Sequence, residues 1–271
     1  MIKIWKNTKT LDSYDSGLNF TLNENQADII LSGSKKIVLD NFENLKAIFR
    51  CGIGKDNIPE QEAQESGILV RFPSKKTINI IFEETANFTC NLIFKMIYSD
   101  VGDLQKWIKY DRIYLGNLNL LVIGMGNIGK RVYNKMENFM NVHSFDILHQ
   151  NEDELEKLIK ISDCITIHIP NTIENKNFFN KDKFLLMKEK SILINTARGD
   201  IVNEGDLFEV LSKNKIKAAF DVFWNEPYNG KLKQFHPHSF YMTPHISSTC
   251  TDFLKGCRED LDNLIKEISN D

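Results

Sequence analysis

The sequence predicts an α/β protein of two domains, each with a parallel sheet that helices cover on both faces. Its 271 residues exceed the length of a common domain, which is roughly 150 residues. From about residue 25 onward, short apolar runs alternate with segments long enough to be helices. Strands that alternate with helices pair in parallel, so doubly wound sheets are expected in both halves of the chain.

The first third of the chain carries the elements of the smaller domain. Its expected strands are Ala27–Leu31, Lys46–Phe49 and Ile68–Val70. Its expected helical segments are Phe42–Leu45, Glu60–Ser66 and a long apolar helix from Ile81 to Tyr98. Acidic residues begin the second of these segments and Gly67 follows it, which are typical start and stop signals of a helix. Residues 71–80 show no clear period, and we place a domain boundary near the long helix.

The larger domain is expected to follow that boundary. Its strands are predicted at Leu118–Ile123, Val142–Phe145, Cys164–Ile169, Ser191–Asn195 and Lys217–Val222. Its helices are predicted from Lys130 onward, at Glu152–Ile161 and at Glu204–Lys213. The last segment, Thr251–Ser269, has the pattern of one amphipathic helix.

Composition argues against several classes of function. Lysine and arginine (34) nearly balance aspartate and glutamate (37), so the chain has no basic field for nucleic acid. The amino terminus has no signal-peptide pattern, and no apolar run approaches the ~18 residues that span a bilayer. The five cysteines are spread widely without a CxxC pair, which predicts reduced thiols in the cytoplasm and no metal site.

A glycine-rich turn follows the strand that begins at Leu118. Gly124, Gly126 and Gly129 have the GxGxxG spacing, with a strand before the motif and a helix after it. The first glycine permits a tight turn, the second lets the backbone approach a pyrophosphate, and the third lets the helix pack on the strand. The amides around Asn127 and Ile128 would face the phosphates. This context predicts a Rossmann domain that binds a dinucleotide.

The cofactor is predicted to be NAD. Asp146 ends the next strand, about 20 residues after Gly124, where its carboxylate can accept hydrogen bonds from both ribose hydroxyls. The same carboxylate would repel a 2′-phosphate. Lys130, Arg131 and His149 lie nearby in the sequence and leave NADP open.

Four later segments carry a resemblance to a known family. They are His168–Pro170, Ile194–Gly199, Phe220–Pro227 and Thr243–Ile246. In order and approximate spacing they resemble the D-isomer-specific 2-hydroxyacid dehydrogenases, which include glyoxylate, hydroxypyruvate and 3-phosphoglycerate dehydrogenases. Residues 50–58 resemble the substrate loop of this family more loosely, so the resemblance covers most of the chain. Residues 1–45 and 73–83 depart from the family pattern, which leaves the substrate open.

The resemblance implies NAD-dependent interconversion of a D-2-hydroxy acid and its 2-keto acid. The catalytic arginine, glutamate and histidine of the family correspond to Arg198, Glu226 and His245. Histidine titrates near neutral pH and suits proton transfer to the carbonyl oxygen. A carboxylate beside an imidazole stabilises the protonated ring, which is the role implied for Glu226. The planar guanidinium of Arg198 can polarise the carbonyl and bind the substrate carboxylate.

The resemblance also implies the remaining contacts and partners. Backbone amides around Ile53 and Gly54 would hold the substrate carboxylate. Further cofactor contacts are implied for Pro170, Thr196, Ala197 and Asp221, with the Asp221 carboxylate accepting from the carboxamide. The expected partner is a small 2-hydroxy or 2-keto acid, without nucleic acid or membrane, and the expected assembly is a homodimer.

Residues 87–247 are therefore expected to form the NAD-binding domain. Residues 1–86 and 248–271 would form a discontinuous substrate-binding domain, with an active-site cleft between the two. An NAD-sensing binding protein, similar to the corepressor branch of the family, is the alternative, because that branch keeps the same residues. A formate-dehydrogenase-like function is weaker, because that branch has glutamine in place of Glu226. Arg71, Lys75 and Lys76 either hold a phosphate of the substrate or form a solvated basic loop.

Overall fold

The computed structural model describes residues 1–270, which form two compact units. The first unit contains Met1–Ile81 and the segment that starts at Ser248, and the second contains Phe82–Ser247. The boundaries predicted from the sequence are residues 86 and 247, and residue 86 lies in the same helix, Lys75–Ile97, as the observed first boundary. Each unit has its own parallel sheet and its own buried core, in agreement with the predicted α/β fold.

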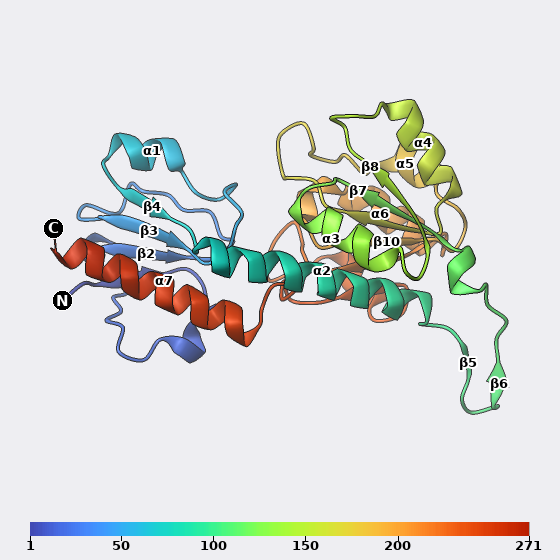
Figure 1. Ribbon diagram of the computed structural model, residues 1–271, viewed down its shortest axis with the longest axis horizontal. Coiled ribbons are helices and arrows are strands. Elements are labelled where there is room, and N and C mark those ends of the chain that lie inside the picture. The colour runs from blue at the N-terminus through green and yellow to red at the C-terminus, as the bar shows by residue number, and fades with distance from the viewer. Residues whose placement is uncertain (271) are drawn as a thin grey trace. The chain divides into compact units, whose positions relative to one another are not determined.

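The sheet of the first unit has four parallel strands in the order β1-β2-β3-β4. The strands are β1 (Ile4–Lys6), β2 (Ile29–Ser32), β3 (Ala47–Arg50) and β4 (Leu69–Arg71). Helices α1 (Glu60–Glu65) and α7 (Thr251–Asn270) cover opposite faces (Figure 1). Alternate residues of β2 point to opposite sides: Ile29 and Leu31 pack in the core with α7, and Ile30 packs in the core with α1.

Two predictions for the first unit were wrong in detail. Residues 42–45 form a bent loop and no helix, because four residues close at most one helical hydrogen bond and cannot offset the cost of nucleation. Helix α2 (Lys75–Ile97) begins six residues before the predicted start at Ile81. A carboxylate from α7 stabilises this early start, since Asp260 accepts hydrogen bonds from the backbone N–H of Ser74 (2.8 Å) and from the Thr77 hydroxyl (2.9 Å).

The second unit has a six-stranded parallel sheet in the order β12-β11-β10-β9-β7-β8. Its strands are β7 (Asn119–Ile123), β8 (Asn141–Phe145), β9 (Cys164–Ile167), β10 (Ile192–Asn195), β11 (Lys217–Phe220) and β12 (Phe240–Met242). Its helices are the later part of α2 together with α3 (Asn127–Met136), α4 (Glu152–Ile161), α5 (Lys181–Leu186) and α6 (Glu204–Ser212). Helices α2 and α3 share one core with the sheet and α4, α5 and α6 share the other, which is a doubly wound arrangement.

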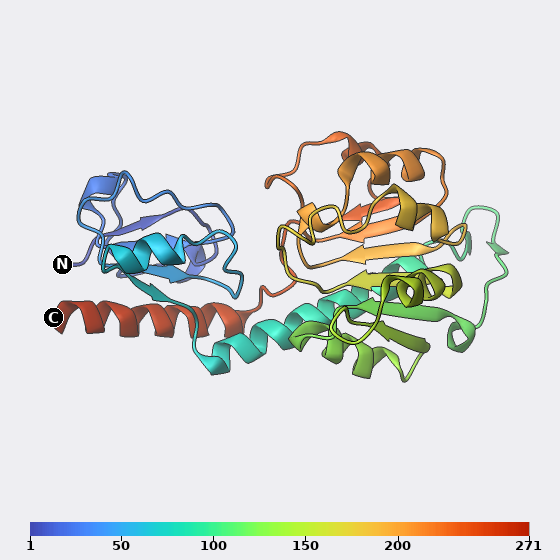
Figure 2. The same cartoon turned by 90° about the horizontal axis from the view of Figure 1, so that it is seen from above.

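Several short elements complete the fold. Strands β5 (Gly102–Asp103) and β6 (Ile108–Lys109) form an antiparallel hairpin that projects from the second unit (Figures 1 and 2). The 3₁₀ turns are Asp12–Tyr14, Glu24–Gln26, Leu115–Asn117, Gly199–Ile201 and Lys231–Phe235. Five short elements were not predicted from the sequence: β1, β5, β6, β12 and α5. No helix within residues 1–270 is long and apolar enough to cross a membrane.

Candidate active site

The glycine turn lies where the strand order of the second unit reverses. The chain leaves β7 for β8 on one side and then crosses to β9 on the other, and ligands of such sheets bind at the carboxyl ends of these strands. Gly124 follows β7 and His168 follows β9, and the His168 N–H donates to the Ile123 carbonyl (2.7 Å). Gly124 has a φ of +94°, and a Cβ there would lie 2.7 Å from the His168 carbonyl oxygen. The two turns are therefore packed backbone to backbone.

The other two glycines have different surroundings. A Cβ at Gly129 would lie 1.9 Å from the Gly124 carbonyl oxygen, so this position has no room for a side chain. Gly126 has no atom within 4 Å of its Cβ position, so the space above its backbone is open. Asn127 and Ile128 form the first turn of α3, where backbone N–H groups lack partners within the helix. A closed turn with open space at its second glycine fits the pyrophosphate of a dinucleotide.

Asp146 follows β8 directly, as predicted, and its carboxylate is held by backbone donors. One oxygen accepts from Met125 N (3.0 Å) and the other from Leu148 N (3.0 Å). The hydrogen bonds from Leu148 and then Met125 keep the pKa of Asp146 below its usual range, so the carboxylate is charged at neutral pH. Each carboxylate oxygen accepts more than one hydrogen bond, so Asp146 can still receive ribose hydroxyls.

Among the basic residues that could favour NADP, Arg131 already interacts with other residues of the second unit. Arg131 donates to the Asn127 carbonyl (2.6 Å) and forms an ion pair with Glu83 (3.3 Å), which also binds Lys135. These contacts keep the pKa of Glu83 below its usual range, with the Lys135 hydrogen bond as the largest cause. Lys130 is exposed beside the turn.

His168 belongs to the wall of this turn. Burial of its ring lowers the pKa of His168 to about 3, and the ring nitrogen Nε2 lies 3.0 Å from the Thr166 hydroxyl. The ring therefore stays neutral at physiological pH and adds no charge to this turn. Pro170, two residues later, is exposed, and its carbonyl accepts from the Asn175 side chain (2.9 Å).

A second group of predicted residues follows the carboxyl ends of β10 and β11. Asn195 ends β10, and its buried amide accepts from Ala197 N (2.9 Å) and donates to the Arg198 carbonyl (2.8 Å). Arg198 is half-buried, and its guanidinium donates to the Ala197 carbonyl (2.8 Å). Asn195 therefore shapes the turn that carries Arg198.

The turn that carries Arg198 packs on the segment that carries Glu226. A Cβ at Gly199 would lie 2.2 Å from the carbonyl carbon of Phe223 and 2.4 Å from the nitrogen of Trp224. Phe223 N in turn donates to Glu226 Oε1 (3.1 Å). Only a glycine after Arg198 allows this approach, so the two segments are held in a defined relation.

Glu226 and His245 form a direct pair. His245 Nδ1 lies 2.8 Å from Glu226 Oε2, and both side chains are half-buried. An ionised carboxylate only accepts hydrogen bonds, so Nδ1 carries a proton and Nε2 is the nitrogen left for a substrate. His245 also has a φ of +55°, in the left-handed region that few residues other than glycine adopt. A strained backbone at a paired histidine is typical of a functional site.

Asp221 holds the loop that carries His245. Its fully buried carboxylate accepts from the Thr243 hydroxyl (2.5 Å), from Ile246 N (2.9 Å) and from Ser247 N (2.8 Å). Three donors from both sides of His245 therefore converge on one carboxylate, and they stabilise the left-handed backbone between them. The contact of Asp221 with a carboxamide stays a prediction.

Ile53 and Gly54 lie in the first unit, in the loop after β3. The neighbouring Arg50 is buried and folds over this loop, donating to the carbonyls of Cys51 (2.5 Å) and Gly54 (3.2 Å). Its guanidinium fills the side of Gly52, where a Cβ would lie 2.8 Å from Nη1. Arg71, which with Lys75 and Lys76 was considered as a binder of a substrate phosphate, forms an ion pair with Glu267 of α7 (2.6 Å).

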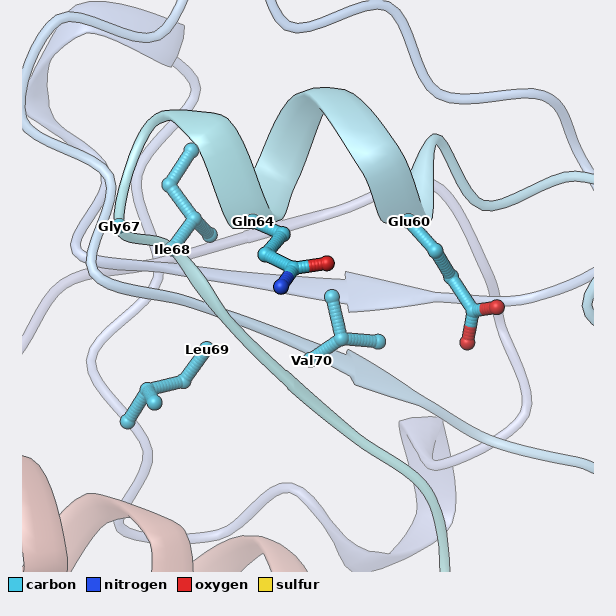
Figure 3. A pocket seen from close by; sticks show the side chains of 6 residues that line it. All are labelled: Glu60, Gln64, Gly67, Ile68, Leu69 and Val70. Carbon is cyan, nitrogen blue, oxygen red and sulfur yellow. The ribbon is translucent and has the colours of Figure 1, made fainter.

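A cavity of about 500 Å³ in the first unit contains none of the predicted site residues. It lies beside the edge strand β4 and below α1 (Figure 3). Its lining residues are Glu60, Gln64, Gly67, Ile68, Leu69 and Val70.

The structure adds residues that the sequence analysis did not single out. Asn195 and Gly199 lie inside the segment Ile194–Gly199 and Thr243 begins the segment Thr243–Ile246, so membership of these segments was the available signal. Gly199 and Thr243 act through partners more than 20 residues away, Phe223 and Asp221, which a local pattern does not show.

Comparison with known proteins shows the family of this chain. The fold and the glycine turn define a dinucleotide-binding α/β protein, and residues 99–247 match the model of the D-isomer specific 2-hydroxyacid dehydrogenase NAD binding domain. The chain belongs to the D-isomer-specific 2-hydroxyacid dehydrogenase family, and these residues are its NAD-binding domain. The family expected from the sequence is thus confirmed.

Two relatives show how far the similarity extends. The chain is 33% identical over 222 residues to a D-3-phosphoglycerate dehydrogenase of Methanocaldococcus jannaschii, which covers 73% of this chain and 41% of that protein. It is 30% identical over 258 residues to a hydroxypyruvate reductase of Thermotoga maritima, which covers 89% of this chain and 84% of that protein. The chain thus spans less than half the length of the first relative and most of the second.

Solved structures share the fold over nearly the whole chain. A D-lactate dehydrogenase from Aquifex aeolicus, crystallised with NAD and lactic acid, superposes with a TM-score of 0.78 and 23% identity. The superposition covers 99% of this chain and 95% of that chain. At this identity the likeness shows the fold alone.

Proposed function

We propose that this chain is an NAD-dependent oxidoreductase that interconverts a D-2-hydroxy acid and its 2-keto acid. The observation that carries the proposal is the 2.8 Å contact between His245 and Glu226 in the same unit as the glycine turn. Family membership supports the reaction class, because relatives are named as dehydrogenases and reductases. The substrate is a small 2-hydroxy or 2-keto acid.

The residues of the chain supply acid–base chemistry and orientation. When bound, the nicotinamide cofactor supplies or accepts the hydride. In the direction of reduction, His245 donates the proton on Nε2 to the carbonyl oxygen of the substrate. Glu226 orients the ring through Nδ1 and stabilises its positive charge. Arg198 binds the substrate carboxylate with its planar guanidinium and polarises the carbonyl.

The remaining site residues are proposed to bind the two ligands. The glycine turn with Asn127 and Ile128 holds the pyrophosphate, and Asp146 accepts from the ribose. Pro170, Thr196, Ala197 and Asp221 line the nicotinamide half of the cofactor. The backbone amides of Ile53 and Gly54 hold the substrate carboxylate.

The proposal is tested by following NADH consumption, with NADPH in parallel. The keto acids to compare are glyoxylate, pyruvate, hydroxypyruvate, 3-phosphohydroxypyruvate and bulkier branched 2-keto acids. Rapid NADH-dependent turnover of one of them would establish the dehydrogenase and its substrate class. Tight NADH binding without turnover on any of them would favour an NAD-sensing binding protein.

Replacing Glu226 with glutamine is expected to lower kcat by roughly 10²- to 10⁴-fold. The amide of glutamine can donate as well as accept, so it no longer selects the ring tautomer with the proton on Nδ1. It also removes the negative charge that stabilises the protonated ring. Steady-state kinetics and NADH titration check this, and NADH affinity should stay unchanged. Glu209→Gln, at an exposed position of α6, is the control, and equal kcat for the two variants would remove Glu226 from the mechanism.

We also propose that two copies of the chain associate through the β5–β6 hairpin. Apolar side chains on and around the hairpin are exposed, with Leu104 and Trp107 each at 79%. The others are Val101, Ile108, Tyr110, Ile113 and Tyr114. A two-stranded hairpin is marginally stable by itself, and a concentrated apolar patch is typical of an interface. Two-fold dimers are the commonest assemblies and use the same patch on both copies.

The dimer is expected to dissociate when the hairpin carries charges. The measurement is size-exclusion chromatography with light scattering. It should give twice the chain mass for the wild type and the mass of one chain for the Leu104→Lys, Trp107→Lys double variant. Leu185→Lys, on the exposed face of α5, is the control and should remain dimeric. A wild-type monomer at micromolar concentration would contradict the proposal.

A further inference from the structure

Thr89 is a fully buried hydroxyl on the face of α2 that packs against the second sheet. Its neighbours Ala86, Cys90 and Ile93 belong to the core that α2 shares with β7 and β10. Thr89 Oγ1 donates to the carbonyl oxygen of Thr85 at 2.8 Å and lies 2.8 Å from Thr196 Oγ1. Thr89 therefore joins α2 to the turn that follows β10.

The direction of the second hydrogen bond follows from the number of protons. A threonine hydroxyl has one hydrogen to donate, and Thr89 gives its hydrogen to the Thr85 carbonyl. The short contact between the two hydroxyls then requires Thr196 to be the donor and Thr89 the acceptor. This arrangement fixes the rotamer of Thr196 and the direction of its proton.

The contact between Thr89 and Thr196 attaches the turn of residues 195–198 to another element of the fold. Asn195 shapes residues 195–198 from within, because both hydrogen bonds of its side-chain amide go to backbone atoms of this turn. Such bonds determine the shape of the turn but do not attach it to another element. The hydroxyl of Thr196, two residues before Arg198, makes that attachment through Thr89.

We propose that Thr89 is a positioning residue for Arg198, acting through the Thr196 hydroxyl. The proposal rests on the proposed function, in which Arg198 binds the substrate carboxylate. Thr89 anchors the turn to a helix in the core, so the guanidinium keeps one position when a substrate arrives. Reactions of bound substrates lose rate steeply when an orienting group moves by about 1 Å. Loss of the anchor should therefore act mainly on substrate binding and turnover, with a smaller effect on cofactor affinity, because the glycine turn and Asp146 lie outside this turn.

The test is the Thr89→Val variant, which keeps the branched shape and removes the hydroxyl. We expect kcat/KM for the preferred 2-keto acid to fall about 10- to 100-fold. Binding of oxamate, a keto acid analogue, to the NADH complex should weaken by a similar factor, as followed by NADH fluorescence. The Kd for NADH itself should change by less than about threefold. Thr89→Ser restores the hydroxyl and should recover most of the loss.

The matched control is Thr85→Val, one turn earlier on the same helix. Valine at position 85 keeps the backbone carbonyl that accepts from Thr89, so kcat/KM and oxamate affinity should stay at the wild-type values. If Thr85→Val loses as much as Thr89→Val, the effect comes from helix packing and the proposal is wrong. A Thr89→Val enzyme with wild-type kinetics and oxamate affinity would also overturn it.

A double-mutant cycle tests the contact through stability as well as through turnover. Thr89→Val, Thr196→Val and the double variant are compared by thermal unfolding and by kcat/KM. Residues in direct contact are not additive, so the double variant should lose no more than the larger single loss. Additive losses in both measurements would overturn the proposal. A wild-type chain that turns over none of the keto acids would instead overturn the proposed function, and with it the role of Thr89 in the reaction.

Discussion

The His245→Asn variant is expected to lose about 10²- to 10⁴-fold in kcat for reduction, the range that a positioned acid or base contributes. His245 is the proton donor of the proposed reaction, and asparagine has no group that titrates near neutral pH. Asparagine is chosen because it adopts the left-handed backbone more readily than alanine does, and His245 has a φ of +55°. The variant therefore removes the ring without adding backbone strain.

Three measurements on this variant separate a chemical role from a structural one. Single-turnover reduction should slow by the same factor as kcat, NADH affinity should change by less than about threefold, and the unfolding temperature should stay close to the wild-type value. His238→Asn, at an exposed position, is the control for loss of a histidine. Loss of NADH binding in His245→Asn would show that the ring serves structure. An unchanged kcat would remove His245 from the mechanism.

The Gly129→Ala variant is expected to lose both stability and cofactor binding. Its Cβ would lie 1.9 Å from the Gly124 carbonyl oxygen, and that oxygen belongs to the turn itself, so α3 and the turn have to move apart. Overpacking of this kind costs about 1–3 kcal/mol. For a chain of this size, each kcal/mol lowers the unfolding temperature by roughly 2–4 °C. The Kd for NADH should rise as well, because the turn moves away from the position in which its backbone would meet the pyrophosphate.

Gly126→Ala is the matched comparison in the same motif. No atom lies within 4 Å of its Cβ position, so the free protein accommodates the methyl group and keeps its unfolding temperature. NADH affinity should nevertheless fall, because the methyl group occupies the space through which a pyrophosphate approaches the backbone. Gly205→Ala, in the first turn of α6, should change neither property. Wild-type NADH affinity in Gly129→Ala would contradict the assignment of this turn to the cofactor.

The elements with strong local patterns were predictable. The buried strands of a parallel sheet are short apolar runs, and helix α4 starts and ends at the predicted residues because an Asn151–Glu154 capping box precedes an amphipathic pattern. The three-residue edge strand β12 and the β5–β6 hairpin lack such a pattern. The early start of α2 depends on Asp260, which is far away in the chain.

The candidate site likewise has a part that local sequence predicts and a part that it does not. Glycine spacing and the acidic residue after β8 pointed to a dinucleotide without any knowledge of the fold, because a phosphate-binding turn is built from neighbouring residues. The identities of Arg198, Glu226 and His245 came from short segments that resemble a family.

Their contacts depend on tertiary structure alone. Gly199 lies against Phe223, Glu226 binds His245, Asp221 holds the loop around His245, and Thr89 reaches Thr196. The residues in each of these pairs are separated by about 20 to more than 100 positions, and only the parallel sheet brings the ends of its strands to one edge. Local sequence could therefore predict the cofactor and name candidate site residues, whereas the packing of the sheet decided which side chains touch.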